Sequence, residues 1–243
     1  MKKQEIWSFI GAGGKSTLIL LTAARKAEEG KKVLVTTTTH TAFTEDSLLR
    51  AGGRLLLGES GEAAAAVLER ESPVAALKEL PGQREKQQGL PEEELQKAVS
   101  RADLVLIEAD GSRRRPFKAP GNHEPAVHPD SSRIILAAGL TALGRSIGES
   151  CHRLREIVAI TGKSGDCLLS ERDMAQVIRE GYLHKCRLRW PGVPVTVILN
   201  QADTGELEER GLLVKKYLEG SGAEVYLFSA WTERKGKDTW NMD

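Results

Sequence analysis

Residues 5–29 read EIWSFIGAGGKSTLILLTAARKAEE and decide the fold of the chain. An apolar run from Ile6 to Ile10 meets a glycine cluster, and apolar residues then recur at helical spacing from Leu18 to Ala27. Glycines let consecutive N–H groups curl around an anion, and the helix that follows directs the positive end of its dipole at the same point. This order predicts a strand, a phosphate-binding loop of the Walker A type and a helix. The predicted nucleotide-binding residues of this stretch are Gly11, Ala12, Gly13, Gly14, Lys15, Ser16 and Thr17.

Two side chains of this stretch are assigned chemical roles. Lys15 supplies a mobile cation for the outer phosphate oxygens, and the hydroxyl of Ser16 is a ligand for a nucleotide-bound Mg²⁺ ion. The usual pattern has a glycine six residues before the lysine, where this chain has Phe9, so the loop is either shortened or entered differently. The alternative interpretation is a glycine-rich turn between a strand and a helix, with an exposed lysine.

Polar residues follow two further apolar runs. Val33–Val35 precedes four threonines, of which Thr37 and Thr38 are candidates to reach Mg²⁺ or the terminal phosphate. Leu104–Ile107 precedes Glu108 and Asp110, two carboxylates that share one face of an extended chain. Carboxylates at such a strand end hold magnesium and orient an attacking group, so both are predicted as metal-binding and catalytic residues together with Lys15. The alternatives are threonines that simply favour strands and an acidic surface turn.

A candidate base-recognition pair occurs near the C-terminus. Asn200 and Asp203 end one predicted strand, and Ser229 and Ala230 end the next. A carboxylate at residue 203 accepts hydrogen bonds from both N1–H and the amino group of guanine, whereas adenine offers an acceptor at N1, so GTP is slightly favoured over ATP. Guanine-nucleotide proteins carry a lysine where this chain has Gln201, and that departure weakens the match.

Composition limits the class of protein. The 243 residues include 35 Lys plus Arg against 34 Asp plus Glu, which argues against nucleic acid or a membrane surface as the main partner. Three scattered cysteines do not form a disulfide framework, and no continuous apolar segment is long enough for a membrane span or a secretory leader. We therefore expect a cytoplasmic protein, with a frayed polar tail at residues 232–243.

The pattern of the whole chain predicts an α/β fold. We expect one P-loop NTPase-like domain over residues 1–243, with three layers and a mostly parallel sheet. A subregion around residues 43–100 is inserted into it, and within that subregion the polar segment 81–91 is predicted as a surface loop. Residues 112–130, which contain the basic run Arg113–Arg115, are predicted as an ordered excursion over the site.

Several segments of the chain together resemble the YqeC family of accessory proteins for selenium-dependent molybdenum hydroxylases. They are GAGGKST, KVLVTTTTH, LIEADGS, the KAPxxxEPxxxP segment from Lys118 to Pro129, AAGLTALG, the Thr161–Gly162 pair and ILNQAD. The resemblance implies a nucleotide-binding protein that takes part in the maturation of a molybdenum enzyme, with that enzyme or its cofactor-processing proteins as partners. The strand endings at residues 108–111 and 200–203 are also similar to those of GTPases that insert nickel into urease and hydrogenase.

Three functions remain open on these grounds. The first is a Mg²⁺-dependent NTP-binding maturation factor with slow hydrolysis of GTP or ATP. The second is a small-molecule kinase or ligase that acts on a cofactor precursor, with the basic run in its acceptor pocket. The third is a binding module that nucleotide switches without turnover.

Overall fold

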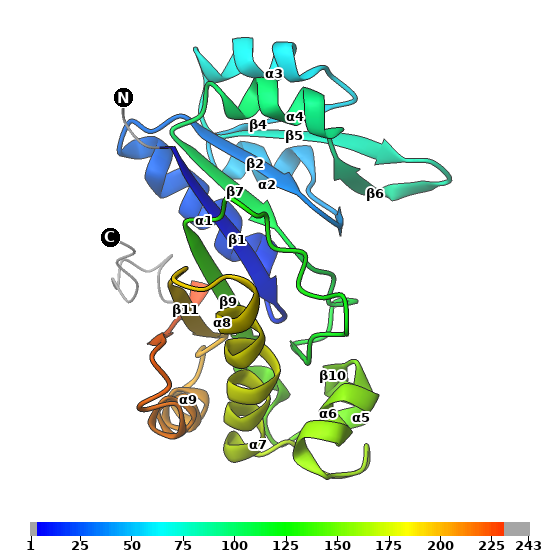
Figure 1. Ribbon diagram of the computed structural model, residues 1–243, viewed down its shortest axis with the longest axis vertical. Helices are drawn as coiled ribbons and strands as arrows, with labels where there is room; N and C mark the ends of the chain where they lie inside the picture. Colours follow the sequence, from blue (N-terminus) through cyan, green and yellow to red (C-terminus); the bar gives the residue numbers. More distant parts are fainter. Residues whose placement is uncertain (1–3, 231–243) are drawn as a thin grey trace. The chain divides into compact units, whose positions relative to one another are not determined.

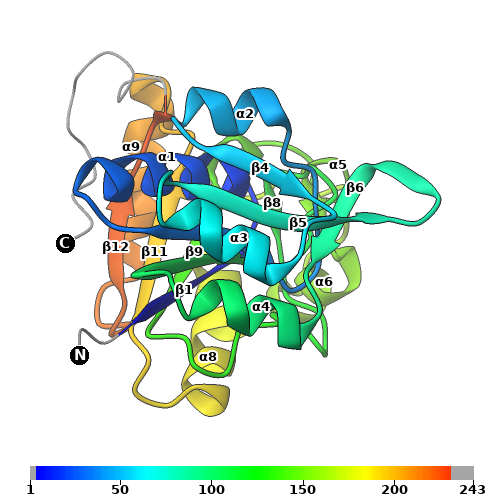
Figure 2. The same cartoon turned by 90° about the horizontal axis from the view of Figure 1, so that it is seen from above.

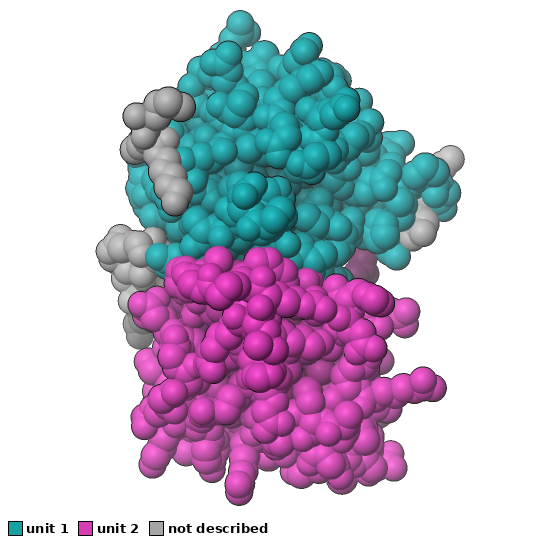
Figure 3. Space-filling model, in the orientation of Figure 1, with its two compact units in different colours: residues 1–9, 16–111, 126–133 teal, residues 10–15, 112–125, 134–243 magenta. Residues whose placement is uncertain are grey.

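The computed structural model describes residues 4–230, so the predicted polar tail lies outside the described residues. Within this part the chain divides into two compact units (Figure 3). Unit 1 contains residues 4–9, 16–111 and 126–133, and unit 2 contains residues 10–15, 112–125 and 134–230. The organisation as a single domain stays a prediction. No helix of residues 4–230 is long and apolar enough to cross a membrane.

Unit 1 alternates strands and helices along the chain. Its strands are β1 (Glu5–Gly11, whose last two residues belong to unit 2), β2 (Val33–Thr37), β3 (His40–Thr41), β4 (Arg54–Leu57), β5 (Val74–Leu80), β6 (Gln83–Gly89) and β7 (Leu104–Glu108). Its helices are α1 (Lys15–Glu28, whose first residue belongs to unit 2), α2 (Glu45–Arg50), α3 (Gly61–Leu68) and α4 (Glu92–Val99). Figure 2 shows α2 and α3 on opposite sides of β4 and β5.

The strands of unit 1 pair in the order β1-β7-β2-β5-β6-β3, with β4 on β5. All pairs among β1, β7, β2, β5 and β4 are parallel (Figure 1). Strands β2 and β7 are buried along their whole length, as expected for parallel strands with helices on both faces. In the register of β7, Glu108 lies between Phe9 of β1 and Thr37 of β2, so the carboxyl ends of β7 and β2 meet at one level.

The segment 81–91 corrects one prediction. Instead of a surface loop it contains β6, which forms an antiparallel hairpin with β5 and also pairs with β3. The residues of β6 read QREKQQG, and a strand made of polar residues carries no alternation of apolar and polar positions by which it could be recognised. Strand β5, which precedes β6, was also missed in the sequence. Its first four residues are apolar and buried, but the charged residues Lys78 and Glu79 then interrupt the apolar pattern.

Unit 2 combines a parallel sheet with several short helices. Its strands are β8 (Phe117–Lys118), β9 (Arg133–Gly139, whose first residue belongs to unit 1), β10 (Cys151–His152), β11 (Val195–Asn200) and β12 (Glu224–Leu227). Its helical segments are a 3₁₀ turn at Leu140–Ala142, α5 (Ile147–Ser150), α6 (Leu154–Thr161), α7 (Glu171–Gln176), a π-helical segment at Val177–Leu183, α8 (His184–Arg189) and α9 (Gly205–Tyr217).

Strand β11 is the centre of the sheet of unit 2, because β9 and β12 pair with it in parallel on its two sides. Strands β8 and β10 form a separate parallel pair. Ser170 caps helix α7, since its hydroxyl accepts a hydrogen bond from the N–H of Asp173. Together the two units confirm the predicted α/β class with a mostly parallel sheet, and residues 5–28 have the strand, loop and helix order of a P-loop NTPase-like fold.

An ion-pair network stabilises the segment that follows β8. Glu124 accepts hydrogen bonds from Lys118 Nζ at 2.9 Å, from Arg153 Nη2 at 2.9 Å and from the N–H of Gly121 at 3.0 Å. The side chain of Lys118 is fully buried. Burial alone would raise the pKa of Glu124, but the hydrogen bonds from Arg153, Gly121 and Lys118 outweigh it and lower the pKa to about 2.

This low pKa predicts how stability depends on pH. The ordinary pKa of the carboxyl is 4.5, so on acidification the unfolded chain takes up the proton before the folded chain does. The stabilisation is therefore complete above pH 4.5 and is lost as the pH falls toward 2. We expect Glu124→Gln to lower the free energy of unfolding at pH 6 by roughly 1–3 kcal/mol, measured by urea denaturation. The difference in free energy of unfolding between the wild type and this variant should become smaller below pH 4.5. The exposed Glu149→Gln is the matched control, and a difference for Glu124→Gln that stays the same at low pH would contradict the account.

Candidate functional site

The loop between β1 and α1 is short. Strand β1 continues to Gly11 and α1 begins at Lys15, so only residues 12–14 separate them. Phe9, which stands where the usual pattern has a glycine, is a fully buried residue of β1. The departure noted in the sequence is therefore explained by a shortened loop, since the strand occupies the place where a longer loop would begin.

Gly13 and Gly14 are required by both backbone conformation and space. Their φ angles are +87° and +104°, a region that residues with a side chain rarely adopt. A Cβ atom on Gly13 would lie 2.4 Å from the Cα of Gly139 and 2.5 Å from the Pro116 carbonyl oxygen. A Cβ atom on Gly14 would lie 2.4 Å from Nδ2 of Asn200. The loop thus lies directly on the carboxyl ends of β9 and β11 in unit 2.

The same strand ends also hold the loop by hydrogen bonds. The N–H of Ala12 donates to the Ala137 carbonyl at 2.9 Å, so this amide is not among those available to a phosphate. Gly11, at the start of the loop, packs equally closely on β9, because a Cβ there would lie 2.2 Å from the same Ala137 oxygen. Asn200, at the end of β11, donates from Nδ2 to the Gly13 carbonyl at 2.6 Å. Asn200 is therefore attached to the loop itself.

The first turn of α1 provides the amides that remain. The N–H groups of Ser16 and Thr17 have no acceptor within the helix, because the carbonyl groups four residues before them lie outside it. The positive end of the helix dipole is at the same place and favours an anion there. Lys15 is only 3% exposed, and its Nζ donates to the Gly11 carbonyl at 2.7 Å. The ammonium group is therefore held at the loop by a main-chain oxygen.

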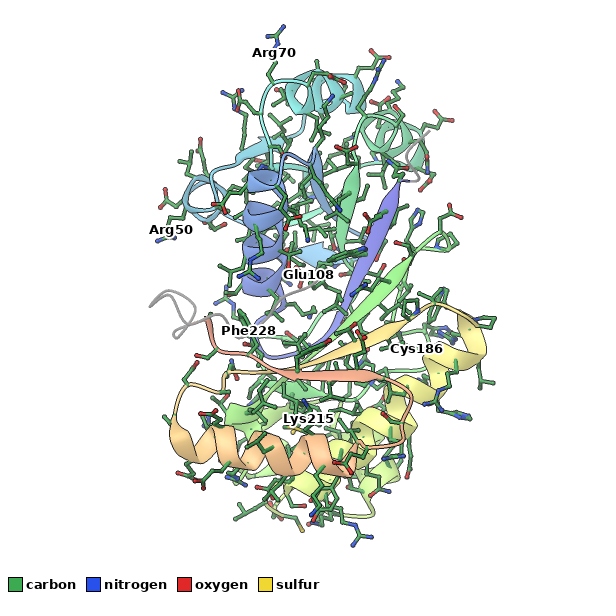
Figure 4. All side chains as sticks on the ribbon, turned by 90° about the vertical axis from the view of Figure 1, so that its left-hand side faces the viewer. Arg50, Arg70, Glu108, Cys186, Lys215 and Phe228 are labelled. Carbon is green, nitrogen blue, oxygen red and sulfur yellow. The ribbon has the colours of Figure 1, made fainter. Side chains whose placement is uncertain are left out.

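Within unit 1, a group of oxygen atoms surrounds Glu108, which Figure 4 labels. Its Oε2 accepts a hydrogen bond from the Thr41 hydroxyl at 2.7 Å and a long one from the exposed Ser16 hydroxyl at 3.5 Å. The Thr37 hydroxyl donates to the main-chain carbonyl of Glu108 at 2.7 Å. We call Ser16, Thr37, Thr41 and Glu108 the Glu108 cluster. The parallel register of β7 and β2 places Thr37 beside Glu108, while Ser16 comes from α1 and Thr41 from β3.

Two other predicted residues of unit 1 have different surroundings. Asp110 is fully buried beyond the end of β7, and the main chain beside it is held by hydrogen bonds from Ala109 N–H to Phe9 O and from Ala126 N–H to Ala109 O, both 2.9 Å. The hydroxyl of Thr38 donates to the Ala126 carbonyl at 2.7 Å. No group of three or more His, Cys, Asp or Glu side chains in residues 4–230 is arranged to hold a metal ion by itself.

Thr41 and Gln87 were missed in the sequence analysis. Antiparallel pairing of β3 with β6 places Gln87 opposite Thr41, whose hydroxyl is bound to Glu108. The Gln87 side chain donates from Nε2 to the Phe43 carbonyl at 3.1 Å, and its buried Oε1 has no hydrogen-bond partner among the described residues. Only the recognition of β6 as a strand would have drawn attention to Gln87.

The predicted base-recognition residues of unit 2 lie together. The Ser229 hydroxyl donates to the exposed carboxylate of Asp203 at 2.5 Å, and the N–H of Ala202 donates to the Phe228 carbonyl at 3.0 Å. Ala230 follows Ser229 directly and is the last described residue. Phe228 itself is buried at the end of β12 (Figure 4).

Gln201, which replaces the usual lysine, makes a contact of its own. It has a φ angle of +66°, and its Oε1 accepts a hydrogen bond from the Thr141 hydroxyl at 2.5 Å. A Cβ atom on Gly139 would lie 2.4 Å from that same oxygen. The side chain therefore packs over the end of β9 and beside the strand end that supports the phosphate loop.

Comparisons with known proteins agree with the motifs of the sequence. The family described as YqeC protein matches residues 7–155. The uncharacterized protein YqeC of Escherichia coli (strain K12) is 38% identical over 97 residues, which are 39% of this chain and 38% of that protein. The matched segment thus spans well under half of this curated relative.

Solved structures of FtsY are distantly similar. FtsY from Mycoplasma mycoides has a TM-score of 0.43 and 15% identity, over 93% of this chain and 60% of that chain. Chloroplast FtsY from Physcomitrella patens has a TM-score of 0.41 and 15% identity, over 93% of this chain and 59% of that chain. At such low scores we draw no conclusion from this similarity.

The family match is different in extent, because it begins within β1, includes the phosphate loop and β7, and continues past β10. Residues 7–155 are more than half of the 243 residues. This protein therefore belongs to the YqeC family.

Proposed function

We propose that this protein binds a nucleoside triphosphate through residues 11–17. The observation that carries the proposal is the close packing of Gly13 and Gly14 on β9 and β11, which leaves no room for a side chain at either position. Glycines with positive φ angles just before a helix let consecutive main-chain N–H groups point toward one anion. The absence of side chains at these positions lets the backbone approach that anion closely. The buried ammonium group of Lys15 adds the positive charge that a polyphosphate requires.

The Glu108 cluster of unit 1 suits a Mg²⁺ ion. All of its possible metal ligands are oxygen atoms, which Mg²⁺ prefers. In nucleotide sites, Mg²⁺ is bound by one or two carboxylates together with phosphates and waters. The lack of a larger cluster of acidic or imidazole ligands in the described residues is compatible with that mode. We assign Ser16 and Glu108 as the residues that would hold the ion, with Thr37 and Thr41 positioning Glu108. Asp110 remains a second candidate carboxylate.

Each of the assigned residues then has a defined task. When bound, Mg²⁺ would neutralise charge on the phosphates. Lys15 would stabilise the charge that develops on the transferring phosphoryl group, and Asn200 would keep the loop in its binding conformation through the Gly13 carbonyl. Glu108 already accepts hydrogen bonds from two hydroxyls, so it is a weak general base, and we propose slow hydrolysis.

A second candidate function is phosphoryl transfer to a small acceptor. The basic run Arg113–Arg115 favours it, because Pro116, the next residue, accepts a hydrogen bond from Gly139 at 2.9 Å and lies against Gly13 of the loop. Appearance of a phosphorylated pterin-type compound in place of free phosphate would distinguish transfer from hydrolysis.

The biological role that we propose is maturation of a selenium-dependent molybdenum hydroxylase. Membership of the YqeC family supports this role, and the partners would be that hydroxylase or its cofactor-processing proteins. All three cysteines are free thiols, which supports a reducing compartment such as the cytoplasm.

The loop can be tested by a matched pair of glycine substitutions. Gly13 and Gly30 both have positive φ angles, but only at Gly13 would a Cβ meet other atoms. Each substitution by Ala costs about 1–2 kcal/mol of stability from backbone strain. We expect Gly13→Ala to abolish binding of Mg²⁺ with GTP or ATP in calorimetry and Gly30→Ala to preserve it. Equal affinities in the two variants would contradict the proposed loop.

The base contact is tested by Asp203→Asn. An amide at this position can no longer accept hydrogen bonds from both N1–H and the amino group of guanine, so GTP binding should weaken. The dissociation constant for GTP divided by that for ATP should therefore rise by about tenfold. Competition binding with both nucleotides measures the ratio, and Glu206→Gln on α9 is the control. An unchanged ratio would remove Asp203 from base recognition.

The biological role is tested in cells that lack this chain. We expect the wild-type chain and the Lys15→Ala variant to be expressed equally, but only the wild type to restore molybdenum hydroxylase activity, because the variant lacks the phosphate-binding cation. Lys215→Ala, an exposed lysine on α9 (Figure 4), should behave as wild type. Full hydroxylase activity without this chain would disprove the maturation role.

A further inference from the structure

Gln87, on strand β6 of unit 1 (labelled in Figure 1), has a buried oxygen atom with no hydrogen-bond donor among the described residues. The residue is only 8% exposed, and its Nε2 donates to the Phe43 carbonyl at 3.1 Å. Because a carbonyl can only accept, the amide nitrogen has to face Phe43, and the amide oxygen Oε1 has to face elsewhere. A buried acceptor without a donor destabilises a folded chain, and a bound water or ion is a usual reason for such an atom.

Strand pairing places Gln87 beside the Glu108 cluster. Thr41 lies directly opposite Gln87 in the antiparallel register, so the two side chains are on the same face of the sheet. The Thr41 hydroxyl donates to Glu108 Oε2 at 2.7 Å. Gly89, two residues after Gln87, is on that face too, and a Cβ atom there would lie 2.2 Å from the Thr37 carbonyl oxygen. This face of β6 is therefore turned toward the strand end at which Thr37 and Glu108 meet.

The two threonines beside Glu108 cannot supply the missing donor. Each threonine hydroxyl has a single hydrogen. That of Thr41 is donated to Glu108 Oε2, and that of Thr37 to the main-chain carbonyl of Glu108 at 2.7 Å. The ionised phosphate oxygens of a nucleotide only accept hydrogen bonds, so they cannot supply the donor either. A water molecule has two hydrogens and can donate to two acceptors at once.

We propose that Gln87 accepts a hydrogen bond from a water molecule of the hydrated Mg²⁺ ion at the Glu108 cluster. Mg²⁺ loses its waters reluctantly and usually keeps several of them in a nucleotide site. One such water can donate one hydrogen to Gln87 Oε1 and the other to the Glu108 carboxylate. Gln87 is thus a positioning residue, which orients a metal ligand and is itself oriented by the Phe43 carbonyl. The inference rests on the proposed function, because it takes the Mg²⁺ site at Glu108 as given.

The affinity for a metal ion tests this role. We would titrate Mn²⁺, which also prefers oxygen ligands, into a mixture of a non-hydrolysable GTP analogue and excess protein, and follow the free ion by EPR spectroscopy. Gln87→Met has a side chain of similar length without the acceptor oxygen, so it should weaken Mn²⁺ binding by about tenfold. Gln88→Met is the matched control, because residue 88 is the next residue of β6 and lies on the opposite face of the sheet. It should bind Mn²⁺ as the wild type does.

Further measurements separate this role from a structural one, since Gln87→Met also loses the hydrogen bond to Phe43. Circular dichroism checks that the variant is folded, and its affinity for the GTP analogue in EDTA should equal that of the wild type. If Gln87→Met does not fold, Gln87→Asn replaces it, because its amide is one methylene shorter and withdraws the oxygen. Gln87→Glu keeps an acceptor oxygen at this place, so it should bind Mn²⁺ at least as tightly as the wild type.

The possible results distinguish this inference from the proposed function. Equal Mn²⁺ affinities of the wild type and Gln87→Met would overturn the role of Gln87 and leave the proposed function standing. The role is also overturned if Gln87→Glu binds Mn²⁺ as weakly as Gln87→Met, or if Gln87→Met loses as much nucleotide affinity in EDTA as it loses Mn²⁺ affinity. A wild-type protein that binds no nucleotide would refute the proposed function and this inference with it.

Discussion

The close approach of the loop at residues 12–14 to the ends of β9 and β11 is the constraint on which the site in unit 2 depends. Without side chains at Gly13 and Gly14, the backbone lies directly against Gly139 and the Asn200 amide. The hydrogen bond from Asn200 to Gly13 and that from Ala12 to Ala137 then hold the loop at two points. A loop fixed in this way loses little conformational entropy when it binds an anion, which is the advantage of a preformed site. The proposed phosphate binding therefore depends on how the loop is fixed, and a longer loop is not required for it.

The Glu108 cluster of unit 1 depends on a different physical feature, the register of buried parallel strands. Strands β2 and β7 are buried along their whole length and begin with apolar residues, so their register is fixed by burial on both faces. Polar residues can therefore follow only at the strand ends, where Thr37 and Glu108 meet. The antiparallel strands β3 and β6 add Thr41 and Gln87 to this end. Buried polar atoms are tolerated here because most of them are paired, as the hydrogen bonds of Thr37 and Thr41 to Glu108 show.

The sequence allowed the main elements to be predicted because their signals are local. A strand, three glycines, the Lys15–Ser16 pair and an amphipathic helix occur within 25 residues, and the apolar runs before Glu108 and Asn200 end where the strands end. The polar strand β6 could not be recognised, since its residues become a strand only by pairing with β5. The cluster around Glu124 was equally hidden, because Lys118 and Arg153 are brought to it by pairing between two-residue strands. Long-range pairing decides these sites, and single-sequence patterns do not report it.

Binding of a polyphosphate by residues 13–17 is the central claim, and a structure of the protein with Mg²⁺ and a non-hydrolysable triphosphate tests it most directly. The account predicts phosphate oxygens within hydrogen-bond distance of the N–H groups of Gly14 and Ser16, with Lys15 Nζ moved from the Gly11 carbonyl to the phosphates. A triphosphate bound elsewhere, with Lys15 still donating to Gly11, would contradict it.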